Sequence, residues 1–269
     1  APLRLTASQS PSTFPLEKSS QAEIWSQAEQ DLLTAASLLP VKNDVIGKPT
    51  KGAAYAVLGK IYVYEEDFDK AIEILEPLTK SPYTYRLVED FAWNFDDVHE
   101  NNEESIFELL MEPVGGTDIW GDGENINSTQ SEADPPMSCI NERAIRYADV
   151  LLLLAESYLR GKQDLPMAIG YLNQIRERAN LNPYSGAQTY EAVFNDLERQ
   201  RAIEFFVEGE RFYDLRRWGL LEKRMQTCNE VRYKQLMTGK VGDTNRYYYY
   251  PIPSKELETN PLCPPNEGW

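Results

Sequence analysis

The sequence contains few of the residues on which common active sites depend. It has 3 cysteines and 1 histidine in 269 residues. The cysteines, Cys139, Cys228 and Cys263, are far apart and form no CxxC pair, so the pattern predicts neither a structural zinc site nor a disulfide framework. The single histidine, His99, excludes an HExxH zinc motif and disfavours a Ser–His or Cys–His catalytic triad.

Long apolar runs and an excess of basic residues are also lacking. The longest apolar run, at residues 150–155, is far too short to span a bilayer. Lys and Arg total 27 against 43 Asp and Glu, which gives a formal net charge of −16. A surface this acidic repels phosphate backbones and anionic lipids, so the composition argues against nucleic-acid binding and peripheral membrane binding. The 16 tyrosines and 5 tryptophans instead suggest an exposed protein with amphipathic contact surfaces.

Apolar residues recur at helical spacing through most of the chain. A capping box, Ser20-x-x-Glu23, precedes a helix that Pro40 ends. Thr50 caps a second helix, and a third is expected over about 68–78. These features predict an all-α protein.

Two helix pairs match the tetratricopeptide hairpin pattern. In the first, over about 51–80, Gly59 and Ala71 are the small residues that let two antiparallel helices cross closely. The second pair, over about 146–180, repeats the pattern with one residue added in the turn. Because the pairs are far apart in the sequence, they predict separate hairpins with insertions rather than a tandem solenoid. Ordinary helical hairpins remain the alternative.

Three further segments complete the organisation. Gly, Asp, Asn, Ser and Pro dominate residues 112–138, which predicts a long variable loop of the kind that is usually functional or disordered. A helix capped by Thr189 leads into a segment rich in charges at 190–219. Residues 246–269 are Pro-rich and predict an extended C-terminal segment without another long helix.

The segment VEGERFYDLRRWG, residues 207–219, mixes charged and aromatic side chains too closely for every charge to reach solvent. Arg201, Glu204 and Glu208 share one helical face, and Gly209 allows a bend after them. Arginine suits buried pairing because its flat guanidinium binds a carboxylate through two hydrogen bonds. We therefore predict a structural brace of paired charges and aromatics, formed by Arg201, Glu204, Glu208, Arg211, Asp214, Arg216 and Trp218.

Two alternatives for this segment are weaker on chemical grounds. Glu204 and Glu208 have a spacing that a pair of catalytic carboxylates could use, but the nearby arginines would keep both ionised and leave no general acid. A phosphate site would need Gly-rich backbone N–H groups, which the segment lacks. Catalysis and anion binding stay open as alternatives. The sequence predicts no catalytic residue, no cofactor and no metal site.

This segment, in the longer form RAIEFFVEGERFYDLRRWG, resembles the signature of the SusD/RagB family. Further segments agree with the family pattern in order: APLRLT, FPLEKSSQAEIWSQAEQDLLTAASLLP, KGAAYAVLGKIYVYEEDFDKAIEILEPL, NNEESIFEL, RYADVLLLLAESYL, AIGYLNQIRERA and YYYYPIPSKELETNPLCPPNEGW. The resemblance implies one SusD-like domain over 1–269, with an all-α fold, tetratricopeptide-type hairpins and long irregular loops.

Members of this family are nutrient-binding lipoproteins on the outer-membrane surface of Bacteroidota. The resemblance implies non-catalytic binding of a glycan or peptide and its delivery to a TonB-dependent transporter of the SusC type. Members begin with a lipoprotein signal and an acylated cysteine, whereas this chain begins at Ala1, so we expect the N-terminal portion and its lipid anchor to be absent from it. Two rivals stay open: an assembly subunit of an outer-membrane complex without a small ligand, and a helical glycoside hydrolase.

For a sugar ligand, an aromatic face packs on the apolar face of the ring, and Asp, Asn or Arg side chains bind the hydroxyls. Trp120 in the variable loop is the best such platform in the sequence, and Trp93 in FAWNFDD is the next. The alternatives are that Trp120 pins its own loop and that Trp93 belongs to the core. The polar residues around Trp120 complete the candidate site: Asp118, Asp122, Asn125 and Asn127.

Two other groups of residues are expected to be structural. The tyrosines at 247–250 precede PIP at a fixed place in the family pattern, which favours a structural role. Asp96, Asp97 and Glu100 could be read as calcium ligands, but they lack the spacing of a known calcium loop. We expect them to form a solvated turn.

Overall fold

The computed structural model describes residues 2–7, 16–111, 140–206, 208–227 and 250–266. The chain packs as two compact units, residues 1–30 with 205–269 and residues 31–204, and each is considered by itself. The predicted all-α fold class is confirmed, because helices dominate the secondary structure of the described residues. The organisation as one domain stays a prediction.

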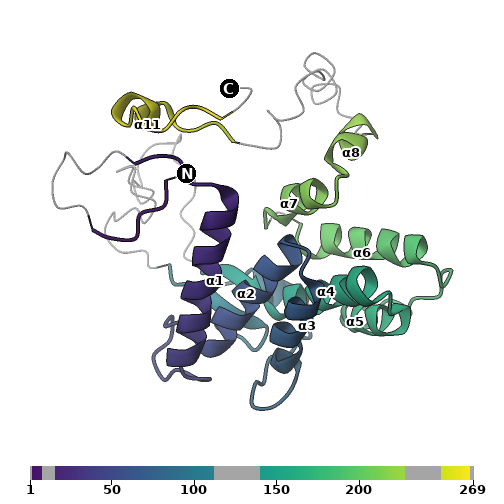
Figure 1. Cartoon of the computed structure of the whole chain (residues 1–269). Helices are drawn as coiled ribbons and strands as arrows, with labels where there is room; N and C mark the ends of the chain where they lie inside the picture. Colours follow the sequence, from purple (N-terminus) through teal and green to yellow (C-terminus); the bar gives the residue numbers. More distant parts are fainter. Residues whose placement is uncertain (1, 8–15, 112–139, 207, 228–249, 267–269) are drawn as a thin grey trace, which may run out of the picture. The chain divides into compact units, whose positions relative to one another are not determined.

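The larger unit is built from helices that pack in pairs. α2 (Lys51–Tyr64) packs on α3 (Phe68–Leu75), and α4 (Tyr147–Ser157) packs on α5 (Leu165–Arg178). α6 (Tyr190–Glu204) contacts both α4 and α5. Figure 1 shows these helices side by side, with α4 among the others. Every residue of α4 is buried, since neighbours cover it on all sides, and α4 is therefore the centre of the core.

The predicted helix starts are confirmed. The capping box before α1 (Gln21–Leu38) is complete: the Ser20 N–H donates to the Glu23 carboxylate at 2.8 Å, and the Glu23 N–H donates to the Ser20 hydroxyl at 3.2 Å. Thr50 and Thr189 each accept a hydrogen bond from the backbone N–H three residues later, at 3.2 and 3.3 Å. These side chains satisfy backbone donors that have no partner within the helix.

The first hairpin crosses as closely as its small residues predict. A Cβ atom added at Gly59 would clash with the Leu75 side chain, and Ala71 is fully buried. The absence of a side chain at Gly59 thus lets α2 and α3 approach one another. The relation of this hairpin to tetratricopeptide repeats stays a prediction.

The C-terminal ends of α3 and α4 both depart from a regular α-helix. α3 ends at Leu75 rather than near position 78 and continues as a 3₁₀ turn, η2 (Glu76–Thr79), because Pro77 has no N–H to donate to the α-helical ladder. α4 runs into a π-helical turn, η4 (Tyr158–Lys162). A π turn holds more residues than an α turn, which accounts for the residue added in the second hairpin.

The structure also contains a strand pair that the sequence did not predict. β1 (Ser105–Leu109) pairs antiparallel with β2 (Glu142–Arg146). Both strands are short, and strand formation depends on cross-strand partners more than on intrinsic preference, so the segments SIFEL and ERAIR carry little signal alone. Because β2 leads directly into α4, the pair places Arg146 at the N-terminus of the central helix.

The smaller unit contains short helices and extended segments. Its described helices, apart from the beginning of α1, are α7 (Glu210–Arg217), α8 (Leu221–Thr227) and α11 (Ser254–Thr259). Gly209 has φ = 85°, a left-handed conformation that favours glycine, so the predicted bend before α7 is confirmed. Asn260, just after α11, donates to the carbonyl of Leu16 at 2.9 Å, which ties the C-terminal segment to residues near the start of the chain.

Two observations concern cysteine and membrane spans. Cys263 is buried and free, while Cys139 and Cys228 lie outside the described residues. Among the helices that the structure describes, none has the length and apolar character needed to cross a membrane.

The Gly59 contact predicts a loss of stability on substitution. Gly59→Ala should lower the free energy of unfolding by about 1–3 kcal/mol, because the new Cβ overpacks against Leu75. Gly170→Ala is the matched control: it lies inside α5 with no atom within 4 Å of the added Cβ, so it should raise stability by roughly 0.5–1 kcal/mol. Urea unfolding followed by circular dichroism measures both. Equal effects of the two substitutions would contradict a close crossing at Gly59.

Candidate functional site

A ring of alternating buried charges lies in the larger unit. Arg146 donates to Glu104 and, at 3.0 Å, to Glu204. Arg178 donates to Glu104 at 3.2 Å and to the two oxygens of Glu204 at 2.5 and 2.6 Å. The side chain of Glu104 is 0% exposed and that of Arg146 is 1% exposed. These residues, termed the four-charge ring, join the strand pair to the C-terminal ends of α5 and α6.

An aromatic contact attaches a neighbouring turn to the four-charge ring. The turn is η3 (Phe91–Asn94), a 3₁₀ turn that carries Trp93. The guanidinium carbons of Arg178 and Arg146 lie 4.9 and 5.9 Å from the centre of the Phe91 ring. Both distances allow a cation–π attraction. The ring of charges therefore helps to hold the segment in which a ligand contact is predicted.

A second buried cluster joins α2, α4 and α6. Asp149 accepts a hydrogen bond from Arg201 at 2.8 Å and lies 3.1 Å from the Nζ atom of Lys60. Burial alone would raise the pKa of Asp149, but the charges of Lys60 and Arg201 together hold that pKa well below its usual value. Since the Arg201 side chain is 0% exposed, the cluster connects three helices in the interior.

The first half of the predicted brace is thus buried and ion-paired. Glu204 is bonded to two arginines, which leaves its carboxylate without the open side that a substrate would need. Arg201 pairs with Asp149. This arrangement favours a structural role for both residues over the catalytic alternative. The role itself stays a prediction that substitution tests.

The second half of the brace belongs to the smaller unit. Asp214 is buried and accepts hydrogen bonds from Arg217 at 2.8 and 3.1 Å. The Arg217 guanidinium lies over the Trp218 ring at 4.7 Å. The remaining predicted members, Glu208, Arg211 and Arg216, are partly exposed. Charges and aromatics therefore also contact each other in this half.

Of the predicted ligand contacts, Trp93 is the one that falls within the described residues. Its indole stacks on the imidazole of His99, with ring centroids 4.4 Å apart and planes at 11°. The His99 Nδ1 atom lies 2.7 Å from Asp96, and the His99 backbone N–H donates to the same carboxylate at 2.8 Å. The hydrogen bond from the His99 side chain lowers the pKa of Asp96. A carboxylate therefore orients the ring on which Trp93 stacks.

Two side chains fix the backbone on both sides of this stack. The Nδ2 atom of Asn102 donates to the carbonyls of Trp93 and His99 at 3.3 and 3.0 Å. The Nη2 atom of Arg143 donates to the same two carbonyls at 3.1 and 3.3 Å. Arg143 is part of β2 and lies 3.4 Å from Glu108 of β1. The Trp93–His99 stack is thus anchored to the strand pair.

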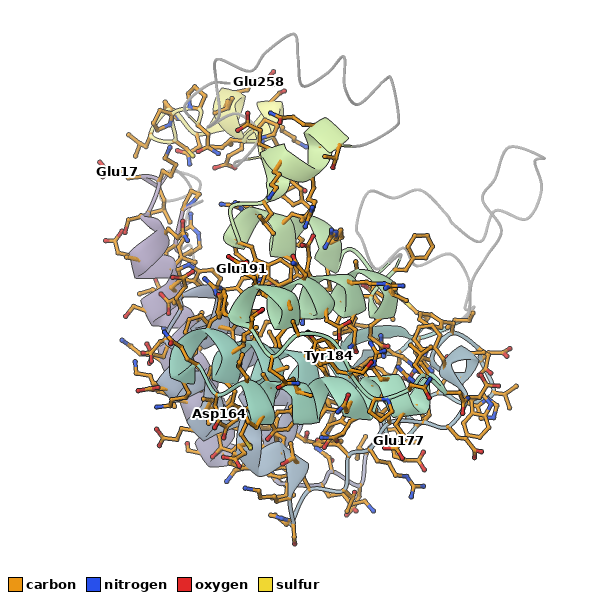
Figure 2. The ribbon with its side chains drawn as sticks, turned by 90° about the vertical axis from the view of Figure 1, so that its right-hand side faces the viewer. Glu17, Asp164, Glu177, Tyr184, Glu191 and Glu258 are labelled. Carbon is orange, nitrogen blue, oxygen red and sulfur yellow. The ribbon has the colours of Figure 1, made fainter. Side chains whose placement is uncertain are left out.

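A cleft of about 730 Å³ opens beside Trp93, a volume typical of small-ligand sites. Trp93, Tyr85 and Tyr147 supply its aromatic lining. Figure 2 labels Glu177, another lining residue, toward the C-terminal end of α5, with Asp164 at the helix's other end. The lining residues with charged or amide side chains are Arg86, Glu89, Glu103, Gln174, Glu177 and Arg178. This site, termed the Trp93 cleft, combines aromatic surface with polar groups, as sugar-binding sites do.

Asp96 and Glu100, which the sequence placed in a solvated turn rather than in a calcium site, each have a polar partner in the structure. Asp96 is bonded to His99, and Glu100 accepts a hydrogen bond from the Asn141 N–H at 2.7 Å. No group of three His, Cys, Asp or Glu residues in the described parts of the chain could hold a metal ion. The loop 112–138 lies outside the described residues, and with it Trp120, Asp118, Asp122, Asn125 and Asn127.

Sequence reasoning missed the partners of the predicted brace. Arg146 and Arg178 bind Glu204, and Asp149 binds Arg201, although none of these three partners was singled out. One signal was present in the sequence. Asp149 is an acid in the apolar helix YADVLLLLAES, and an acid in such a helix must be paired when the helix is buried.

The described residues form a mainly helical scaffold with buried ion pairs and an aromatic-lined cleft. Residues 122–269 match the family model described as the SusD family. This match covers more than half of the chain, and the chain therefore belongs to the SusD family.

Individual relatives agree with this assignment. The SusD-like protein P2 of Formosa agariphila is 32% identical over 141 residues, covering 49% of this chain and 26% of that protein, so the match spans about a quarter of this relative's length. The crystal structure of a SusD superfamily protein from Bacteroides vulgatus is 54% identical with a TM-score of 0.85, covering 100% of this chain and 73% of that one. The structure of a laminarin binding SusD-like protein has a TM-score of 0.75 at 20% identity, covering 100% and 74%, which shows a common fold.

Substitution of Asp149 in the cluster that joins α2, α4 and α6 should cause a large and pH-dependent loss of folding stability. Asp149→Asn should lower the free energy of unfolding by about 3–5 kcal/mol near neutral pH, because Lys60 and Arg201 keep buried charges without a carboxylate. The deficit should shrink as pH falls below about 4, where the unfolded chain binds a proton at Asp149 and the folded protein does not.

Urea unfolding at several pH values measures this deficit. Asp69→Asn is the matched control, since it removes an exposed pair with Lys162 and should cost about 0–1 kcal/mol. A deficit for Asp149→Asn no larger than that of the control would contradict a buried, mutually dependent cluster.

The Trp93–His99 stack can be observed directly by NMR. Because His99 is the single histidine, an untagged protein gives one set of imidazole signals. The ring current of the stacked indole should shift these signals upfield, and Trp93→Leu should return them toward free histidine. Phe95→Leu is the control, since Phe95 contacts Phe91 instead. Unshifted signals in the unmodified protein would show that the two rings do not stack in solution.

Proposed function

We propose that this chain binds a glycan at the cell surface without transforming it and passes it to a TonB-dependent outer-membrane transporter of the SusC type. The observation that carries the proposal is the Trp93 cleft, which offers an aromatic platform among hydrogen-bonding groups. Membership of the SusD family supports it, as does the fold shared with a laminarin binding relative. Attachment to the outer membrane through an N-terminal lipid is part of the same proposal, and a peptide ligand is the alternative.

The chemistry of the cleft fits a sugar ring. One face of a pyranose carries C–H groups that pack on an indole, while its hydroxyls need donors and acceptors at the edge. His99 covers one face of the Trp93 indole, so a sugar can use only the other face. Gln174 and the carboxylates around the cleft supply acceptors for hydroxyl groups.

The state of the nearby carboxylates supports binding without turnover. A glycoside hydrolase needs one carboxylic acid that keeps its proton and one carboxylate, on opposite sides of the substrate. Glu104 and Glu204 are sequestered in the four-charge ring. At the cleft, a hydrogen bond from Arg86 lowers the pKa of Glu103, which is the wrong direction for a general acid.

A binding screen with matched variants tests the proposal. We expect at least one polysaccharide to bind saturably in calorimetry, and Trp93→Ala to weaken that binding by about tenfold or more, equivalent to about 1.4 kcal/mol, with an unchanged melting temperature. Tyr190→Ala is the control, because Tyr190 is exposed on α6 and stacks on Phe194 outside the cleft. Trp120→Ala should also weaken binding and leave the fold intact if the variable loop supplies a second platform.

Other results would favour the rivals. An assembly subunit should show no saturable ligand in the same screen but should co-purify with a β-barrel protein from native membranes. A hydrolase should release sugar from a bound polysaccharide, and one Glu or Asp substitution should abolish the release. A large loss of stability in Trp93→Ala would identify Trp93 as a core residue.

A further inference from the structure

The Trp93 cleft is lined by more carboxylates than guanidinium groups, and the guanidinium groups are paired with carboxylates. Glu89, Glu103 and Glu177 line the cleft together with Arg86 and Arg178. Carboxylates thus outnumber guanidinium groups among the lining residues. The difference becomes larger when the partners of the two arginines are considered.

Both arginines already neutralise other carboxylates. Arg178 donates to Glu104 and Glu204 within the four-charge ring. The Nε atom of Arg86 donates to Glu103 at 3.1 Å. Both positive charges are therefore already offset by carboxylates, so neither arginine adds net positive charge to the cleft.

The remaining carboxylates face the cleft without such compensation. Within the described residues, neither Glu89 nor Glu177 has an ion-pair partner, and both are exposed. The aromatic lining and Gln174 add no charge. The cleft consequently has a negative potential at its polar edge and an apolar aromatic surface beside it.

We propose that the Trp93 cleft selects uncharged glycans and rejects those that carry uronate or sulfate groups. This inference rests on the proposed glycan-binding function and specifies the class of its ligand. Carboxylates accept strong hydrogen bonds from sugar hydroxyls, so a neutral polymer gains contacts at the same groups that repel an anionic one. A ligand carboxylate a few ångströms from Glu89 or Glu177 meets like charge that low-salt solvent screens poorly.

The test compares polymers that differ in charge alone. Laminarin, amylose and galactomannan are each used in native form and after partial oxidation of C6 to the carboxylate, and affinities are measured by calorimetry at low ionic strength. For any polymer that binds, the oxidised form should bind roughly tenfold more weakly, and added salt should reduce that ratio. The triple variant Glu89→Gln, Glu103→Gln, Glu177→Gln should reduce the ratio to about threefold or less.

A matched triple variant separates the cleft from the net charge of −16. Its substitutions, Glu65→Gln, Glu73→Gln and Glu191→Gln, change the net charge equally at exposed positions that do not line the cleft. Glu191 is labelled on α6 in Figure 2. This variant should retain the full preference for the neutral polymer, and melting temperatures verify that both triple variants are folded.

The possible outcomes distinguish a failure of the charge-selection inference from a failure of the proposed glycan-binding function. Equal or tighter binding of the oxidised polymer overturns the inference and leaves the proposed function intact. Loss of the preference in both triple variants also overturns it, because the discrimination would then come from the overall charge. If none of the polymers binds in either form, the proposed glycan-binding function fails, and the inference fails with it.

Discussion

The structure of the larger unit depends on the complete pairing of charges that are buried in its interior. Removing a guanidinium or carboxylate from water is costly, and only full pairing with good hydrogen bonds compensates for that cost. In the four-charge ring, each arginine pairs with both carboxylates, so displacing any one member breaks two of these ion pairs. The ring therefore fixes the strand pair against the ends of α5 and α6. Through Phe91 it also fixes the turn that carries Trp93.

Much of the helical framework could be predicted because its signals are local. The Ser20 capping box, the Thr50 and Thr189 caps and the small residue at Gly59 each act within a few residues or within one hairpin. The strand pair could not be predicted, since β1 and β2 are separated by the long segment between 109 and 142 and neither forms a strand without the other. The end of α3 was misplaced because a 3₁₀ turn continues its apolar pattern past Leu75.

The candidate site shows the same division between local and distant information. Trp93 was identified because an aromatic platform in the segment FAWNFDD is visible in the sequence. The cleft around it was not, since its walls come from segments near 85–89, 103, 147 and 174–178, and only the fold brings them together. His99 was considered only for catalysis and metal binding. Its position on the Trp93 ring, with Asp96 behind it, requires a turn whose backbone is held by Asn102 and Arg143.

Arg178 connects the stability of the fold to the chemistry of the cleft. It lines the cleft, yet its guanidinium is bonded to Glu104 and Glu204. An arginine at the edge of a binding site would ordinarily attract anionic ligands, but one committed to buried carboxylates can do so only at the expense of folding free energy. The four-charge ring therefore neutralises the positive charge of Arg178 at the Trp93 cleft, which the same ring helps to position. Exposed residues such as Glu89 and Glu177 are under no such constraint. Their carboxylates can therefore determine which ligand charge the cleft accepts, independently of the stability of the fold.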